Sequence, residues 1–102
     1  MLDAFYAWAR LTLEHVPEHL NTQLTMAHCA HNPSIRVEFA SEQVHGVITC
    51  WQSGTWHAAV TDSYTRSHRY AHHGRLDPAA PLGPQLHSFL RHLGVADYAS
   101  AL

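Results

Sequence analysis

The chain has 102 residues, of which 46% are hydrophobic and 14% charged, a composition typical of a compact domain and unlike that of a disordered chain. Six arginines and no lysine stand against eight acidic residues, and the formal net charge of −2 gives no indication of a nucleic-acid-binding surface. We therefore expect one domain spanning residues 1–102, because the chain is long enough for one hydrophobic core but not for two.

Eleven histidines are many for this length, and metal binding, pH sensing and a GC-rich genome are alternative explanations. The N-terminus shows no basic segment followed by an apolar stretch, and no apolar run approaches the length that spans a membrane. We expect a cytoplasmic protein without a membrane segment. In that compartment Cys29 and Cys50 are expected to be reduced and to behave as small buried hydrophobic residues.

Residues 3–16 predict an amphipathic helix at the start of the chain. Its core-facing residues recur at helical spacing: Phe5, Ala9, Leu13 and Val16, with Trp8 and Thr12 beside them. Asp3 is placed to cap the N-terminus. Pro17 ends the helix, because proline cannot continue its hydrogen-bond pattern.

Four segments in the middle of the chain predict strands. From Leu24 to Cys29 the pattern indicates a first strand or an extended edge segment. From Ile35 to Phe39 apolar and polar residues alternate clearly, which is the period of a strand with one buried face. The run from Val44 to Trp51 and the run from Thr55 to Asp62 flank the turn sequence Gln52-Ser53-Gly54. This arrangement indicates a hairpin.

The length of the hairpin loop follows from the apolar pattern. A two-residue loop would distribute the apolar side chains over both faces of the sheet. A three-residue loop collects them on one face through the pairs Cys50–Trp56, Ile48–Ala58 and Gly46–Val60. It also places Gly54 where such a loop needs a left-handed residue. The three-residue register puts Trp51 on the opposite face, together with Val47, Thr49, His57 and Thr61.

The last third of the chain predicts one more strand and a second helix. A turn over residues 63–66 leads into a strand from Ser67 to His72, and a proline-rich surface crossing follows from Gly74 to Pro84. The strongest helical stripe of the chain comes next: Leu86, Phe89, Leu90 and Leu93. Gly94 ends this helix, and we expect a short helical turn over residues 95–102.

This order of elements predicts an α+β fold: a four- or five-stranded antiparallel meander with an N-terminal and a C-terminal helix packed on one face. The helices are expected to cover five residues of the sheet: Val37, Ile48, Cys50, Ala58 and Val60. The other face is left to solvent or to a partner.

The sequence gives little sign of catalytic chemistry. Serine nucleophile elbows, phosphate-binding glycine loops and the HExxH motif are absent, and Cys29 lies on a predicted strand, where neighbouring residues point to opposite faces. His68 and His72 would share a face, with His28 or His57 as further ligands. Four strand residues span about 13 Å, however, which is too far for one metal ion. We favour solvated histidines over a metal site, and we expect a binding protein that is not an enzyme and holds no cofactor.

Two stretches carry a resemblance to a known family. The run from Asn32 to Phe39 and the run from Gly46 to Gly54, with its Trp51-Gln52-Ser53-Gly54 turn, resemble the core of bacterial immunity proteins of the TriTu type, over about residues 32–78. The resemblance implies that the chain binds and neutralises a cognate toxin. Those proteins tend to be acidic after the hairpin, whereas residues 67–73 are basic to neutral here. The departure concerns the identity and charge of the toxin rather than the fold.

The predicted uncovered face supplies a binding surface. Trp51 stands on it as an interface anchor, unless a terminal segment or a homodimer partner covers the ring. Polar residues of the same face are predicted to surround it: Arg36, Glu38, Thr49, His57 and Thr61. An adaptor or chaperone for a secreted effector is an alternative function, and a gene for a toxin domain beside this one would separate the two.

Overall fold

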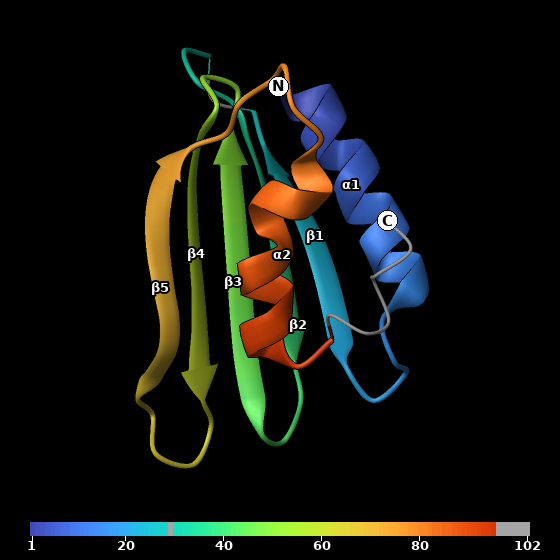
Figure 1. Ribbon diagram of the computed structural model, residues 1–102, viewed down its shortest axis with the longest axis vertical. Coiled ribbons are helices and arrows are strands. Elements are labelled where there is room, and N and C mark those ends of the chain that lie inside the picture. Colours follow the sequence, from blue (N-terminus) through green and yellow to red (C-terminus); the bar gives the residue numbers. More distant parts are fainter. Residues whose placement is uncertain (29, 96–102) are drawn as a thin grey trace.

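The computed structural model describes residues 1–28 and 30–95 and confirms the α+β architecture (Figure 1). Five strands form one antiparallel sheet in the order β1-β2-β3-β4-β5, so each strand pairs with its neighbour in the sequence. The elements are α1 (Leu2–His15), β1 (Asn21–Ala27), β2 (Ser34–Ala40), β3 (Val44–Trp51), β4 (Thr55–Asp62), β5 (His68–Arg75) and α2 (Leu82–Leu93).

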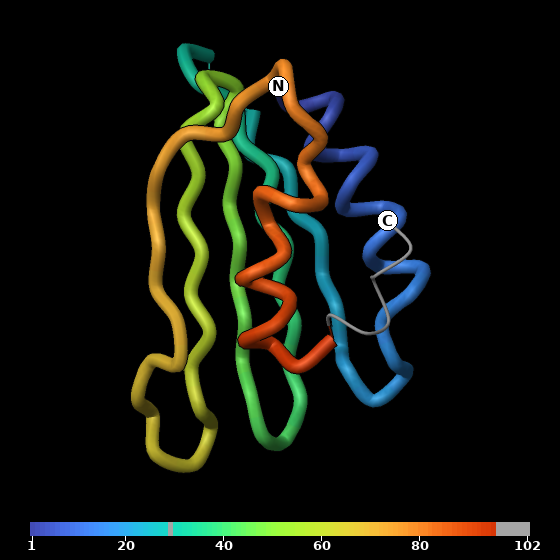
Figure 2. The backbone as a smooth tube through the Cα atoms, in the orientation of Figure 1, coloured from blue at the N-terminus to red at the C-terminus, as the bar shows by residue number. Residues whose placement is uncertain are grey.

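Both helices lie on the same face of the sheet, as the ribbon and the backbone tube show (Figures 1 and 2). Helix α1 contacts β2 and β3, helix α2 contacts β3, β4 and β5, and the two helices touch each other. The five sheet residues predicted to lie beneath them are all buried: Val37, Ile48, Cys50, Ala58 and Val60. We call the opposite side, which neither helix covers, the open face.

The β3–β4 hairpin has the predicted three-residue loop. Cys50 is opposite Trp56 and Ile48 is opposite Ala58, which keeps the apolar side chains on the helix-covered face. Gly54 has a φ of +93°, in the left-handed region that glycine enters without a steric penalty. The register derived from the apolar pattern is therefore confirmed.

The two helices follow the predicted stripes, with one correction. In α2 the four stripe residues are buried, and Gly94 ends the helix in the left-handed conformation, as expected. Helix α1 ends at His15, before Pro17, and buries Phe5 and Trp8. The predicted cap was wrong: Met1 holds the N-cap position without a side-chain hydrogen bond. Asp3 lies inside the first turn, where its charge still favours the helix dipole.

The boundaries of the outer strands also differ from the prediction. Strand β1 starts at Asn21 and ends at Ala27, because its residues pair with the whole of β2 rather than only with the alternating part. Strand β5 extends to Arg75, so Gly74 and Arg75 belong to the sheet and not to the proline-rich crossing. Cys29 and most of the predicted C-terminal turn lie outside the described residues; Val95 is buried.

Candidate functional site

The open face carries every residue that the sequence predicted for partner binding. Antiparallel pairing places Arg36 opposite Thr49 and Thr49 opposite His57, in one row across β2, β3 and β4. Glu38 is opposite Val47 in the next row. Thr61 stands further along β4, and Trp51 ends β3 on the same face. Their shared location follows from the register, and their role in binding stays a prediction.

Hydrogen bonds between the loop before β2 and the turn after β3 hold the end of β3, and with it Trp51, in place. The Asn32 side chain accepts a 3.2 Å hydrogen bond from the backbone N–H of Ser53, and the backbone N–H of Gln52 donates to the Pro33 carbonyl at 2.9 Å. The loop before β2 is thus fastened to the turn after β3. This contact fixes the chain on both sides of the strand end from which the Trp51 ring projects.

The half-buried Trp51 ring begins a row of aromatic contacts. Its centroid lies 5.0 Å from that of His57 in an edge-on arrangement, and the His57 ring lies 5.6 Å from that of His73 on the neighbouring strand. His57 and His73 are directly opposite each other in the β4–β5 pairing and are both exposed. His73 is not among the residues that the sequence predicted for the site.

A hollow of about 340 Å³ lies beside this row on the open face. Its floor consists of three residues that face one another across β3, β4 and β5: Val47, Ala59 and Ala71. The surface is hollow there because the two alanine side chains are only methyl groups. Arg36, Thr49, His57 and His73 also line it. The strand alternation placed Val47 on this face, but the hollow itself needs three strands side by side.

The charged groups of the site are few. Arg36 and Glu38 form an ion pair with 2.8 Å between Nη2 and Oε1, and their side chains are 51% and 35% exposed. An exposed pair of this kind contributes little to stability. Within the site, the pair directs the Glu38 carboxylate towards Arg36 and not towards the histidines beside the hollow.

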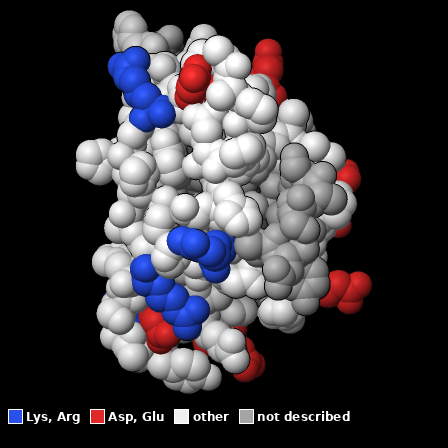
Figure 3. All heavy atoms as spheres, viewed as in Figure 1, with Lys and Arg blue, Asp and Glu red and all other residues white. Residues whose placement is uncertain are grey.

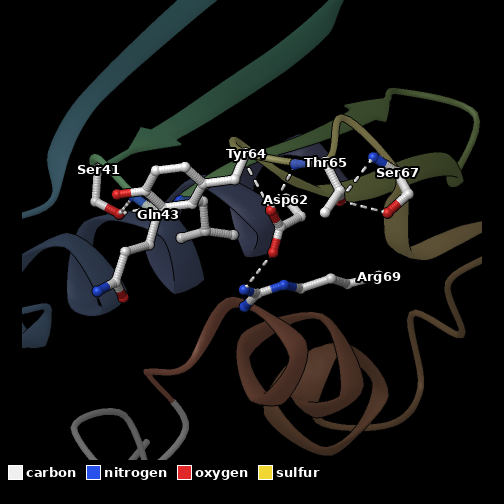
Figure 4. A network of polar contacts seen from close by, with 8 residues as sticks. Ser41, Gln43, Asp62, Tyr64, Thr65, Ser67 and Arg69 are labelled. Atoms are coloured by element: carbon white, nitrogen blue, oxygen red, sulfur yellow. Dashed lines mark hydrogen bonds and ion pairs between the residues drawn. The ribbon is translucent and has the colours of Figure 1, made fainter.

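Polar contacts around Asp62 hold the turn between β4 and β5 (Figure 4). Asp62 accepts hydrogen bonds from the backbone N–H groups of Tyr64 and Thr65 at 2.9 and 3.0 Å, and from Arg69 Nη2 at 2.8 Å. The Arg69 guanidinium and then these backbone N–H groups lower the pKa of Asp62 from 3.8 to about 2. The network closes the turn from which β5 runs back along β4.

A β-bulge next to this turn corrects the histidine prediction. The pairing shifts between Val60 and Thr61, so that Thr61 is opposite His68 while Val60 is opposite Tyr70. His68 therefore shares the open face with Thr61, and its Nδ1 lies 3.2 Å from Thr61 Oγ1. His72 lies on the other face, where its ring contacts Trp56 at 4.8 Å. The prediction that His68 and His72 share a face was wrong.

The other chemical groups of the described chain do not add a reactive centre. No cluster of three metal-ligating side chains occurs within residues 1–28 and 30–95. Cys50 is buried, and desolvation raises the pKa of its thiol from 9.0 to about 11. A thiol of that kind is protonated at neutral pH and is not a nucleophile. Neither described helix is long and apolar enough to cross a membrane.

A second recess lies between α1 and the sheet edge. It has a volume of about 260 Å³ and is lined mainly by apolar side chains, among them Leu2, Tyr6 and Met26. Tyr6 and Met26 are 38% and 44% exposed. It is a second surface on which apolar side chains are exposed.

A five-stranded antiparallel sheet with two helices on one face and an uncovered opposite face defines a small α+β protein. The model of one family, Immunity protein TriTu, matches residues 3–92. The chain belongs to this family of immunity proteins. No curated protein matches the chain.

Proposed function

We propose that this protein neutralises a cognate bacterial toxin by binding it in the cytoplasm through the open face, with Trp51 as the central anchor and without catalysis. One structural observation carries the proposal. The open face combines a large aromatic ring with an adjacent hollow, and neither helix covers it. Family membership supports the immunity role, and the uncovered ring with its adjacent hollow supports the open face as the binding surface.

The energetics support an interface of this kind. Tryptophan is enriched among the residues that dominate binding energy, where it is surrounded by contacts that exclude water. Trp51 packs against His57 on the open face, so the free protein already orients the ring. A ring fixed before binding loses less conformational entropy on association. Polar neighbours such as Arg36, Thr49 and Thr61 then form the rim.

The first experiment asks whether a toxin is bound at all. The protein is co-expressed with the toxin domain encoded by the neighbouring gene, and cell viability and co-purification are measured. We expect the cells to survive and the two chains to purify together. A bound partner that stays active but becomes more stable would instead indicate an adaptor or chaperone. No association and no protection would refute the proposed function.

The second experiment locates the surface. Trp51→Ala should weaken binding by about 2 kcal/mol or more, which is roughly thirtyfold in Kd, while leaving the fold intact because the ring is outside the core. Tyr6→Ala, in the recess beside α1, is the matched control and should bind normally. If Tyr6→Ala is the variant that loses neutralisation, the toxin docks on the α1 recess and not on the open face.

A further inference from the structure

The open face differs in charge from the rest of the molecule. The pairing places four histidines on it: His45, His57, His68 and His73. Among the strand residues of this face Glu38 is the only acid, and Arg36 already binds it. The chain as a whole has eight acidic residues against six arginines, a formal net charge of −2 with histidine neutral. Figure 3 shows the opposite, helix-covered side, where acidic groups lie along the margin next to α1 and arginines lie over the rest of this side.

The arrangement of two of these histidines suggests a ligand. His57 and His73 are directly opposite each other on adjacent strands, and their ring centroids are 5.6 Å apart. A carboxylate placed beside the two rings can accept a hydrogen bond from an N–H group of each. Both rings line the hollow. An anionic group of a bound partner would therefore lie at the rim of the hollow, within reach of both.

The floor of the hollow indicates which kind of partner side chain fits into it. Its floor consists of Val47, Ala59 and Ala71, which offer no side-chain hydrogen bonds. A floor of this kind accommodates an apolar side chain and disfavours an unpaired polar one. A partner segment that fits the site thus combines an apolar side chain, which enters the hollow, with a carboxylate at the rim.

We infer that the open face recognises an acidic segment of the toxin, in which an apolar side chain fills the hollow and an adjacent carboxylate binds between His57 and His73. The inference rests on the proposed function and names the chemistry of the partner. The other charged or titratable groups on this face are Arg36, Glu38, His45, His68 and, at the end of β5, Arg75. The described helices pack on the opposite face and bring none to it.

The direction of the pH dependence follows from this contact. Histidine side chains ordinarily gain their charge between about pH 8 and pH 5. A toxin carboxylate favours the charged rings, so the complex takes up protons that the free protein has not yet bound, and binding tightens as the pH falls. Each proton fully taken up changes the affinity by about tenfold per pH unit. We expect at least about tenfold tightening from pH 7.5 to 5.5 and weaker binding at high salt.

The test measures the affinity for the toxin domain encoded by the neighbouring gene across this pH range, at low and at high salt. Each variant is compared with the native protein at the same pH, so that titration of the toxin itself cancels. His57→Gln combined with His73→Gln should remove most of the pH dependence and leave binding near its weak, high-pH value. His73→Arg, which carries a permanent charge, should bind more tightly at pH 7.5 than the native protein. His87→Gln, exposed on α2, is the control and should keep the native profile.

The outcomes separate this inference from the proposed function. Binding that is flat with pH, or that tightens as the pH rises, overturns the acidic-segment inference and leaves neutralisation intact. The same holds if the double glutamine variant keeps the native profile. Absence of binding at every pH refutes the proposed function and this inference together.

Discussion

Helix α2 approaches the sheet so closely at Gly46 that a single methyl group there tests the packing. A Cβ atom built on Gly46 would lie 2.6 Å from Leu93 Cδ1 and 3.4 Å from Phe89 Cζ. Contacts below 3.0 Å require a shift of one partner. The substitution Gly46→Ala therefore crowds a region that is already closely packed.

The magnitudes can be worked from this geometry. Overpacking a core costs about 1–3 kcal/mol, and we expect about 1–2 kcal/mol for Gly46→Ala, because the end of the Leu93 side chain can rotate. Leu93 is 4% exposed, and Leu93→Ala should cost about 2–5 kcal/mol. In the double variant the new methyl group occupies part of the space that Leu93 leaves. The double loss should then be smaller than the sum of the single losses by about 1 kcal/mol.

The assay is urea unfolding of the native protein, the two single variants and the double variant. The control replaces Leu82, at the other end of α2 and about 16 Å from Leu93 along the helix axis. Gly46→Ala and Leu82→Ala should be additive within about 0.5 kcal/mol. If Gly46→Ala and Leu93→Ala are equally additive, the close approach of α2 to β3 is refuted.

Three further predictions concern stability. Gly54→Val should cost about 1–2 kcal/mol, because a β-branched residue is strained at a φ of +93°, and an unchanged urea midpoint would contradict the assigned loop. Phe89→Ala, which removes a fully buried ring packed 5.8 Å from that of Phe39, should cost about 3–5 kcal/mol; a smaller loss, with the thermal midpoint nearly unchanged, would contradict its place in the core. The lowered pKa of Asp62 stabilises the fold above about pH 3.8, and this contribution is lost as the pH falls through that value towards 2, because the unfolded chain takes up the proton first. The difference in urea midpoint between the native protein and Asp62→Asn should therefore shrink from pH 5 to pH 2, and a constant difference would argue against the contact with Arg69.

The sequence by itself determined the β3–β4 hairpin and the face on which Trp51 stands. Side chains alternate along a strand with a period of two, and only one loop length keeps Ile48 and Ala58 on the same face. Both facts are local, so they can be derived without knowing the rest of the fold. The same holds for the apolar stripe of α2 and for Gly94, which ends that helix. Both can be recognised from residues that lie close together in the sequence.

Tertiary structure decided the remainder of the candidate site. The bulge at Val60 and Thr61 moves His72 to the helix-covered face and sets His73 opposite His57. A bulge adds one residue to one strand of a pair, and a period-two pattern does not reveal where that residue is inserted. The hollow depends on Ala59 and Ala71 meeting across two strands, which is again a matter of pairing.

The same distinction applies to the core. Gly46 appears in the sequence as a weak point in a strand, since glycine there offers no side chain to pack. Only the position of α2 shows that the missing side chain is what lets Leu93 approach β3. Alternation along a strand is a property of one segment, whereas the distance between a helix and a sheet is fixed by residues far apart in the chain. For that reason the sequence determined which face of the sheet is covered, and the tertiary structure determined how closely α2 approaches it.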